Sequence, residues 1–219
     1  MSQLIFKFPF KAKYYEQDYY VSNNNFSAYR LIESWPNWPD KWVKIFGPKG
    51  SGKTHLSNIL KKKIPTAIIF EASTLNDDKI IHLKNSECVI IDNYNENIDE
   101  KLLYSILNES KQVDNYVVIN SNSPIKNFKY ELEDLRSRAE SFVNLGIDLP
   151  TDDLLRVIIT KNFSDKQIKI SPKISEYIIK NIERSYEKVF KFIKEIDDLS
   201  LSSGKSININ LIKKVLINE

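Results

Sequence analysis

The sequence predicts an α/β fold, with a mostly parallel five-stranded sheet and flanking helices, followed by a small all-helical domain. Two observations predict the sheet. Short apolar runs alternate with helical patterns, and three of the five glycines gather at residues 47–52, between a strand and a helix. A third observation predicts the helical domain, because every segment after Pro150 has helical periodicity. The 219 residues therefore divide into an N-terminal arm (1–25), an α/β domain (26–149) and a helical domain (150–219).

Each element follows from its local pattern. A first short helix stops before the prolines of the WPNWPD stretch, since proline cannot continue a helix. Apolar runs of strand length predict strands at residues 42–46, 67–70, 88–91, 116–119 and 142–147. Apolar residues at helical spacing predict helices at residues 26–34, 53–63, 102–107, 152–163, 171–182, 185–201 and 208–216.

Composition excludes several classes of protein. With 42% hydrophobic and 28% charged residues, the chain is neither fibrous nor wholly disordered. Its apolar runs are far shorter than the ~20 residues of a membrane span, and its N-terminus has no export signal. The single cysteine, Cys88, cannot form an internal disulfide, so we expect a cytoplasmic protein. The net charge of +3 neither requires nor excludes a nucleic-acid partner, and we find no strong direct DNA-binding element.

The glycine cluster reads GPKGSGKT, which fits the GxxxxGK[ST] pattern of a phosphate-binding loop, or Walker A motif. Its backbone N–H groups and the start of the next helix can surround a polyphosphate. We expect Lys53 to reach the terminal phosphates and Thr54 to bind Mg²⁺. A glycine turn with a chance lysine is the alternative. The predicted nucleotide-binding residues are Gly47, Pro48, Lys49, Gly50, Ser51, Gly52, Lys53, Thr54 and His55.

Polar residues follow two of the predicted strands. CVIID supplies Asp92 as a second Mg²⁺ ligand. The next residue, Asn93, is an amide that can position water but cannot accept its proton, so we predict weak intrinsic ATP hydrolysis. Asn120 and Asn122 in VINSNSP lie where the carboxyl ends of parallel strands face a ligand. Either one could contact the γ-phosphate or the attacking water, although turn chemistry explains these asparagines, and Asn93, equally well.

The P-loop, CVIIDN, VINSNSP, DLRSRAES and the helical tail, in this order, resemble the AAA+ module of DnaA-related proteins. The chain is more similar still to the short Hda-type regulators that inactivate DnaA, which share the IDN at residues 91–93. The resemblance covers nearly the whole chain, but DnaA continues into a DNA-binding helix-turn-helix domain and this sequence stops at Glu219. It implies ADP or ATP with Mg²⁺ as the cofactor and a helical lid domain after the sheet.

The resemblance implies a role for Arg138 in LRSRAE, which matches the family's arginine finger. Such an arginine reaches a neighbouring subunit's nucleotide and stabilises charge on the transferred phosphoryl group. In the Hda-type mechanism, Arg138 would complete the ATP site of DnaA. From the residues alone, a surface arginine beside Arg136 and Glu140 is the simpler interpretation.

The N-terminal arm also resembles a family motif, by which replication proteins dock on the β sliding clamp of DNA polymerase III. An extended peptide of this kind places an amide and apolar anchors into pockets. A terminal strand packed on the sheet is the competing interpretation. The matching residues are Gln3, Leu4, Phe6 and Phe8.

Two further binding roles are implied by the resemblance. The family recognises adenine through the segment before the P-loop, where Tyr20 and Val21 are the candidates. Its lid carries an arginine that senses the γ-phosphate, and Arg184 in IERSYEKV is the candidate here. The motif departs from the family pattern farther into the helix, where Glu187 and Lys188 stand.

Together these features predict an adenine-nucleotide-binding AAA+ regulator of replication initiation. It would dock on the sliding clamp and use Arg138 to stimulate hydrolysis of DnaA-bound ATP, a negative regulation of replication. The alternative is a DnaA-like or DnaC-like accessory ATPase that loads a helicase or targets DNA, and a small-molecule P-loop kinase is a third reading. A homodimer is compatible with the sequence.

Overall fold

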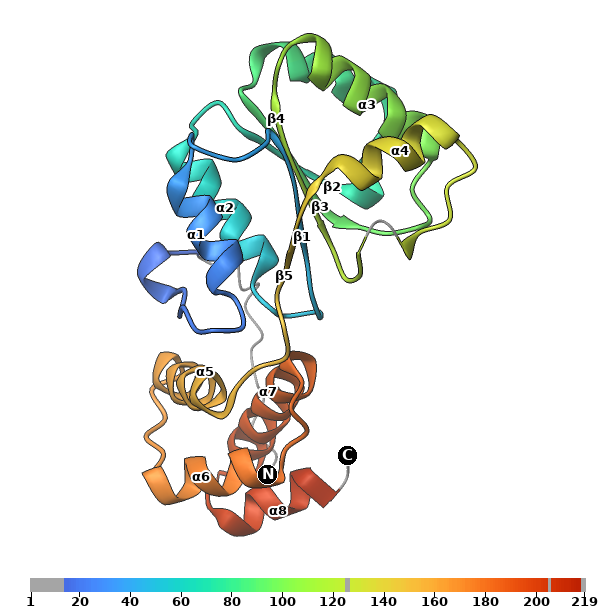
Figure 1. Ribbon diagram of the computed structural model, residues 1–219. Helices are drawn as coiled ribbons and strands as arrows, with labels where there is room; N and C mark the ends of the chain where they lie inside the picture. The colour runs from blue at the N-terminus through green and yellow to red at the C-terminus, as the bar shows by residue number, and fades with distance from the viewer. Residues whose placement is uncertain (1–13, 125–126, 205, 218–219) are drawn as a thin grey trace. The chain divides into compact units, whose positions relative to one another are not determined.

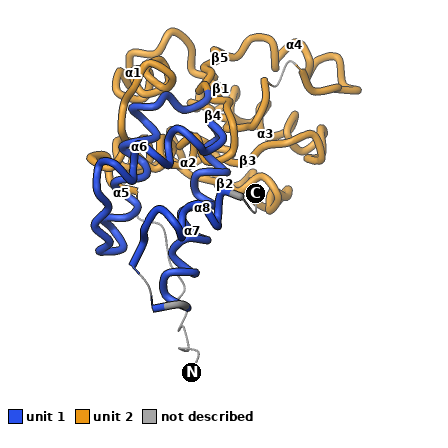
Figure 2. Tube along the Cα trace, turned by 90° about the horizontal axis from the view of Figure 1, so that it is seen from below, with its two compact units in different colours: residues 1–13, 149–219 blue, residues 14–148 orange. Residues whose placement is uncertain are grey.

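The computed structural model describes residues 14–124, 127–204 and 206–217. The chain divides between Asp148 and Leu149 into two compact units, which Figure 2 shows in different colours. We call residues 14–148 the sheet unit and residues 149–219 the helical unit.

The sheet unit contains five parallel strands in the order β2-β3-β4-β1-β5, which confirms the predicted α/β fold (Figure 1). All five predicted strands are present. The largest difference is β3, which continues three residues past its predicted end at Ile91. The strands are β1 (Trp42–Phe46), β2 (Ile68–Glu71), β3 (Cys88–Tyr94), β4 (Tyr116–Ser121) and β5 (Val143–Gly146).

Helices cover both faces of this sheet (Figure 1). Helices α1 (Phe26–Ser34) and α2 (Lys53–Lys63) share one apolar core with residues such as Val43. Helices α3 (Glu100–Gln112) and α4 (Glu133–Ser141) share the other core with residues such as Val117. Neighbouring residues of a strand face opposite cores, as Ile90 and Ile91 do, because successive side chains of a strand alternate between its faces. Buried on both faces, such strands have continuous apolar sequences.

Three short 3₁₀ helices, one before α1 and two between β2 and β3, lie in segments whose sequences have no regular apolar pattern. They are η1 (Glu16–Asp18), η2 (Ala72–Thr74) and η3 (Asp77–Asn85). Residues 14–25, which the sequence analysis assigns to the arm, belong to the sheet unit. Tyr19 packs against the core under α1 and α2, and its ring stacks on Tyr29 with centroids 5.8 Å apart. Burial of these aromatic rings explains why this segment folds onto the sheet unit.

The described part of the helical unit consists of α5 (Asp152–Asp165), α6 (Pro172–Asn181), α7 (Tyr186–Ser203) and α8 (Ile209–Ile217). These are the four helices that the sequence predicts. The hydroxyls of Thr151, Ser171 and Ser185 each accept a hydrogen bond from a backbone N–H of the first turn, which fixes where α5, α6 and α7 begin. Their apolar faces form a separate core that includes Phe163 and Phe192. No described helix has the length and hydropathy needed to cross a membrane.

Candidate functional site

The glycine-rich loop joins the carboxyl end of β1 to the first turn of α2. Gly50 and Gly52 adopt positive φ angles of 83° and 96°, a conformation that favours glycine. A Cβ at Gly52 would also lie 2.9 Å from the ring of Tyr19. The loop therefore turns sharply into α2, where the free backbone N–H groups of a helix N-terminus favour an anion.

Lys53 is the first residue of α2, and its side chain turns back into the loop and is only 5% exposed. Its ammonium donates to the carbonyl oxygens of Gly47 and Pro48 at 2.7 and 3.0 Å, and lies 3.4 Å from Asn122 Oδ1. Burial lowers the pKa of Lys53 to about 8, and the Asp92 carboxylate opposes this shift. The lysine is thus a buried cation with a depressed pKa, which a polyphosphate would stabilise.

Two side chains converge on Asp92, which is 3% exposed near the carboxyl end of β3. Thr54 donates its hydroxyl proton to Asp92 Oδ2 at 2.6 Å. Asn120, from β4, donates to Asp92 Oδ1 at 2.8 Å and also contacts the hydroxyl of Ser57 at 2.7 Å. The predicted residues Thr54, Asp92 and Asn120 therefore form one connected group, to which Ser57 adds a contact that the sequence did not indicate.

Asn93 follows Asp92 but points to a different neighbour. Its amide nitrogen donates to Glu71 Oε2 at 3.0 Å, and its backbone has a φ of 58°. Asn122 is exposed and contacts Lys53. The three asparagines thus contact different residues. Asn120 contacts Asp92, Asn122 contacts Lys53, and Asn93 contacts Glu71 of β2.

The chemistry of these groups fits a magnesium-bound polyphosphate. The Thr54 hydroxyl and the Asp92 carboxylate are hard oxygen ligands of the kind Mg²⁺ prefers when phosphates supply further ligands. No group of three or more His, Cys, Asp or Glu that could hold a metal occurs in the described part of the chain. Ser51 Oγ in the loop and Asn120 Oδ1 beside Asp92 are buried without a hydrogen-bond partner among the described residues. A ligand or a water that forms a hydrogen bond with such a buried polar atom stabilises it.

The segment before the loop carries the residues predicted for adenine recognition. Tyr20 is 44% exposed and its carbonyl accepts a hydrogen bond from Asn25, whereas Val21 is half-buried. Tyr19 is the residue that lies against Gly52. His55 is turned toward this segment, with its Nε2 2.7 Å from the carbonyl oxygen of Tyr15 and its ring edge-on to Tyr19 at 5.3 Å.

Arg138, on α4, is half-buried, and its guanidinium carbon lies 4.6 Å from the centroid of the Tyr104 ring. It lines a cavity of about 340 Å³ together with residues from the amino ends of the strands, such as Trp42 at the start of β1 and Asn115 before β4. The P-loop follows the opposite end of β1. Five strand residues span roughly 16 Å. Arg138 therefore lies near the amino ends of the strands and the P-loop lies at their carboxyl ends.

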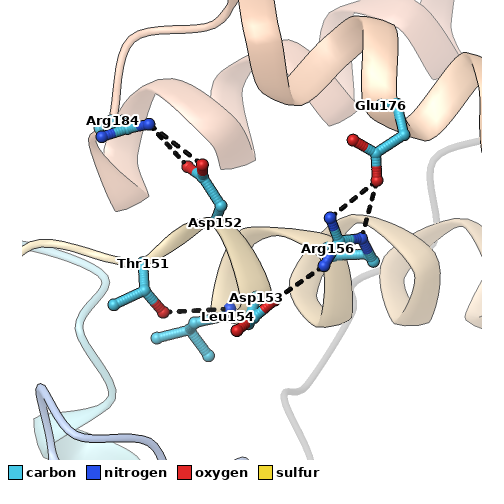
Figure 3. Close-up of polar contacts among 7 residues, drawn as sticks. All are labelled: Thr151, Asp152, Asp153, Leu154, Arg156, Glu176 and Arg184. Atoms are coloured by element: carbon cyan, nitrogen blue, oxygen red, sulfur yellow. Dashed lines mark hydrogen bonds and ion pairs between the residues drawn. The ribbon is translucent and has the colours of Figure 1, made fainter.

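Arg184 belongs to the helical unit, where it pairs with Asp152 of α5 at 2.9 Å (Figure 3). Arg156 of α5 pairs with Asp153 on the same helix at 2.8 Å and with Glu176 of α6 at 2.7 Å (Figure 3). These carboxylates raise the pKa of Arg156, with the Glu176 hydrogen bond as the largest cause. The clamp-motif residues Gln3, Leu4, Phe6 and Phe8 lie outside the described residues.

Comparison with known proteins gives a consistent result. No model of a known protein family matches the chain. DnaA, the chromosomal replication initiator protein of Buchnera aphidicola subsp. Cinara cedri, is 24% identical over 214 residues, which cover 87% of this chain and 48% of that protein. The chain spans about half the length of the curated DnaA relatives it matches.

Two solved structures share the fold. Domain III of DnaA from Thermotoga maritima superposes with a TM-score of 0.76 at 16% identity, covering 96% of this chain and 98% of that one. The AMPPCP-bound DnaA from Aquifex aeolicus superposes with a TM-score of 0.67 at 18% identity, covering 85% and 66% of the two chains. In sequence this chain is similar to DnaA proteins, and in fold it is similar to domain III of DnaA.

Proposed function

We propose that this chain binds ADP or ATP with Mg²⁺ at its P-loop and acts in the control of replication initiation. The observation that carries the first part is the convergence of Lys53, Thr54, Asp92 and Asn120 at one end of the sheet. The bound AMPPCP of the Aquifex aeolicus structure supports a nucleotide as the ligand. Beside Gly52, the Tyr19 ring is a better placed candidate for the adenine pocket than Tyr20.

A thermal-shift experiment tests nucleotide binding. Millimolar ADP or ATP with Mg²⁺ should raise the melting temperature of the wild type and of Lys84→Ala, an exposed lysine away from the loop. Lys53→Ala should show little or no shift, because the buried ammonium that meets the terminal phosphates is gone. Equal shifts in Lys53→Ala and the wild type would exclude the P-loop as the site.

The proposed role in replication rests on the similarity to DnaA in sequence and fold. The proposed mechanism, stimulation of ATP hydrolysis in a partner, rests on Arg138. As an arginine finger in trans, Arg138 would act on the ATP of DnaA and stimulate its hydrolysis. Arg138 lies near the amino ends of the strands, away from the P-loop of its own chain, which supports action on a partner's nucleotide. Its half-buried contact with Tyr104 means that the side chain would have to extend from that ring on docking.

A turnover assay separates Arg138 from its neighbours. Clamp loaded on DNA, DnaA-ATP and this chain are mixed, and loss of ATP from DnaA is followed for the wild type, Arg138→Ala and Arg136→Ala. Arg136 is exposed on the same helix and serves as the matched control. The proposal predicts loss of stimulation by orders of magnitude for Arg138→Ala alone. Equal rates with all three would refute the finger, and ATP-dependent capture of the replicative helicase would favour the loader alternative.

Docking on the sliding clamp is proposed from the sequence of residues 3–8 alone. The triple variant Leu4→Ala, Phe6→Ala, Phe8→Ala should lose clamp binding in a pull-down, because a few apolar anchors carry most of the affinity of such peptides. A variant with Ser2→Ala only should bind as the wild type does. Undiminished binding of the triple variant would discard the motif.

A further inference from the structure

Two side chains meet at the edge of the proposed nucleotide site without a role in holding the phosphates. The Asn93 amide nitrogen donates to Glu71 Oε2 at 3.0 Å. Glu71 ends β2 and Asn93 lies near the end of β3, two adjacent parallel strands in which Glu71 pairs in register with Asp92. The Glu71 carboxylate is thus brought to the residue that directly follows the Mg²⁺-ligand candidate.

The backbone of β3 is specially shaped at this point. Its pairing with β4 runs regularly to Ile91, shifts register, and resumes at Tyr94. Between these residues Asn93 adopts a φ of 58°, a left-handed conformation that asparagine tolerates better than most residues. Irregularities of this kind re-aim side chains and are frequent beside active sites. Here the irregularity turns Asn93 to the glutamate of the neighbouring strand.

The Glu71 carboxylate supplies the proton acceptor that the Asn93 amide lacks. An amide can hydrogen-bond a water and orient it, but it cannot take up the proton that water loses on attack. A carboxylate can. The Asn93 nitrogen carries two hydrogens and donates one to Glu71, so the second can hold a water on the side of the amide where the Glu71 carboxylate lies.

We propose that Glu71 is the general base of ATP hydrolysis in this chain, with Asn93 orienting the attacking water beside it. This inference rests on the proposed nucleotide binding. In the reaction the water oxygen forms a bond to the γ-phosphorus while the bond from that phosphorus to the β,γ-bridging oxygen breaks. The electron pair leaves with ADP, the water proton passes to the Glu71 carboxylate, and phosphate is released. The intrinsic turnover of the chain then depends on a glutamate from β2.

Single-turnover hydrolysis of ATP with Mg²⁺, with the chain in excess, measures this dependence. Glu71→Gln preserves size and should hydrolyse at least about tenfold more slowly, since a positioned base contributes 10²–10⁴-fold in typical enzymes. Glu87→Gln removes an exposed carboxylate just before β3, at the other end of the strand, and should leave the rate unchanged. Asn93→Ala should be slow as well, and the double variant no slower than either single variant, because the two residues act on one water.

Two further readouts do not depend on turnover. AMPPCP should bind the wild type and Glu71→Gln with the same affinity, which separates proton transfer from binding. In the ligand-free chain, the side-chain amide NMR signals of Asn93 should move in Glu71→Gln and stay in place in Glu87→Gln. Unmoved signals in Glu71→Gln would show that the contact does not exist in solution and overturn the inference.

The outcomes distinguish this inference from the proposed function. If AMPPCP binds but Glu71→Gln hydrolyses ATP at the wild-type rate, or the wild type turns over no bound ATP, Glu71 is not the base and nucleotide binding stands. If neither AMPPCP nor ATP binds, the proposed function itself fails and the inference falls with it.

Discussion

The hydroxyl of Thr54 lies 2.6 Å from Asp92 Oδ2, which links the first turn of α2 to the carboxyl end of β3. The two residues are thirty-eight positions apart in the chain, and only the parallel pairing of strands around the P-loop brings them together. In the proposed site, these oxygens would be the protein ligands of a magnesium ion bound with the nucleotide. The contact defines where the metal would lie.

The first prediction concerns this pair. Thr54→Val keeps the shape of the side chain but removes the hydroxyl, so it should weaken binding of ATP in the presence of Mg²⁺ about tenfold or more, with little effect on binding in EDTA. Titrations with a fluorescent ATP analogue, with and without Mg²⁺, measure the difference. Thr160→Val, an exposed threonine of the helical unit, is the control. A loss of affinity as large in EDTA as in Mg²⁺ would argue against a metal ligand.

The second prediction follows from the depressed pKa of Lys53, about 8. At pH 8 about half of the chains hold this lysine unprotonated, and bound phosphates favour its charged form, so nucleotide binding should take up about half a proton. At pH 6.5 the lysine already holds its proton, and uptake should be close to zero. Calorimetric titrations in buffers of different ionisation enthalpy measure the protons directly. Equal uptake at the two pH values would contradict a lysine with a lowered pKa.

The same shift sets how stability depends on pH in the ligand-free chain. The folded-state pKa of about 8 lies below the ordinary lysine value of 10.5, so between these values the unfolded chain binds more protons than the folded one. The contribution of Lys53 to the free energy of unfolding therefore rises with pH across this window. Urea denaturation at pH 7.5 and pH 9.5, compared for the wild type and Lys53→Met, isolates it. The variant should lack this part of the pH dependence, and identical curves would contradict it.

The third prediction concerns Asn120, a fully buried amide that lies 2.8 Å from Asp92 Oδ1. Asn120→Asp would bury two carboxyls side by side, and one of them would have to hold a proton in the folded state. The folded chain then binds more protons than the unfolded one at neutral pH, so the variant should lose about 2 kcal/mol or more of stability at pH 7 and recover part of it near pH 5. Denaturation at the two pH values tests this.

A control for Asn120→Asp is Asn97→Asp, since Asn97 is exposed and the new charge remains hydrated. It should change stability by less than about 0.5 kcal/mol. If Asn120→Asp were as harmless as Asn97→Asp, the buried contact with Asp92 would not exist in solution.

The fourth prediction separates two demands on Gly52. Its positive φ disfavours any side chain, and a Cβ would meet the Tyr19 ring at 2.9 Å. Gly204 also has a positive φ, of 64°, but a Cβ there meets nothing within 4 Å. Gly204→Ala should therefore cost about 1 kcal/mol for the backbone alone, and Gly52→Ala more, because the tyrosine must move. Thermal denaturation of both variants measures the difference, and equal costs would mean that Tyr19 does not press on the loop.

Much of the fold could be predicted from the sequence, because its signals are local. The strands buried on both faces have continuous apolar runs, and the glycines of the P-loop mark its positive φ angles. The hydroxyls of Thr151, Ser171 and Ser185 mark the starts of helices. The 3₁₀ helix η3 could not be predicted in this way, because its residues have no clear apolar period.

The remaining parts of the site depend on contacts between distant segments. That Glu71 meets Asn93 follows from the register of β2 with β3 and from the irregularity after Ile91, neither of which is written in a short motif. That Tyr19 lies against Gly52 depends on how residues 14–25 fold onto the sheet unit. Ser57 of α2 meets Asn120 of β4 only because α2 packs on the sheet.

The central claim is that the P-loop of this chain binds an adenine nucleotide, and isothermal titration calorimetry of the purified chain with ADP and with ATP, in Mg²⁺, tests it most directly. The account predicts a saturable isotherm with one site per chain for at least one of the two, and its loss in Lys53→Ala while the variant remains folded. A wild-type chain that is folded yet gives no binding heat and no melting shift with either nucleotide would contradict the account.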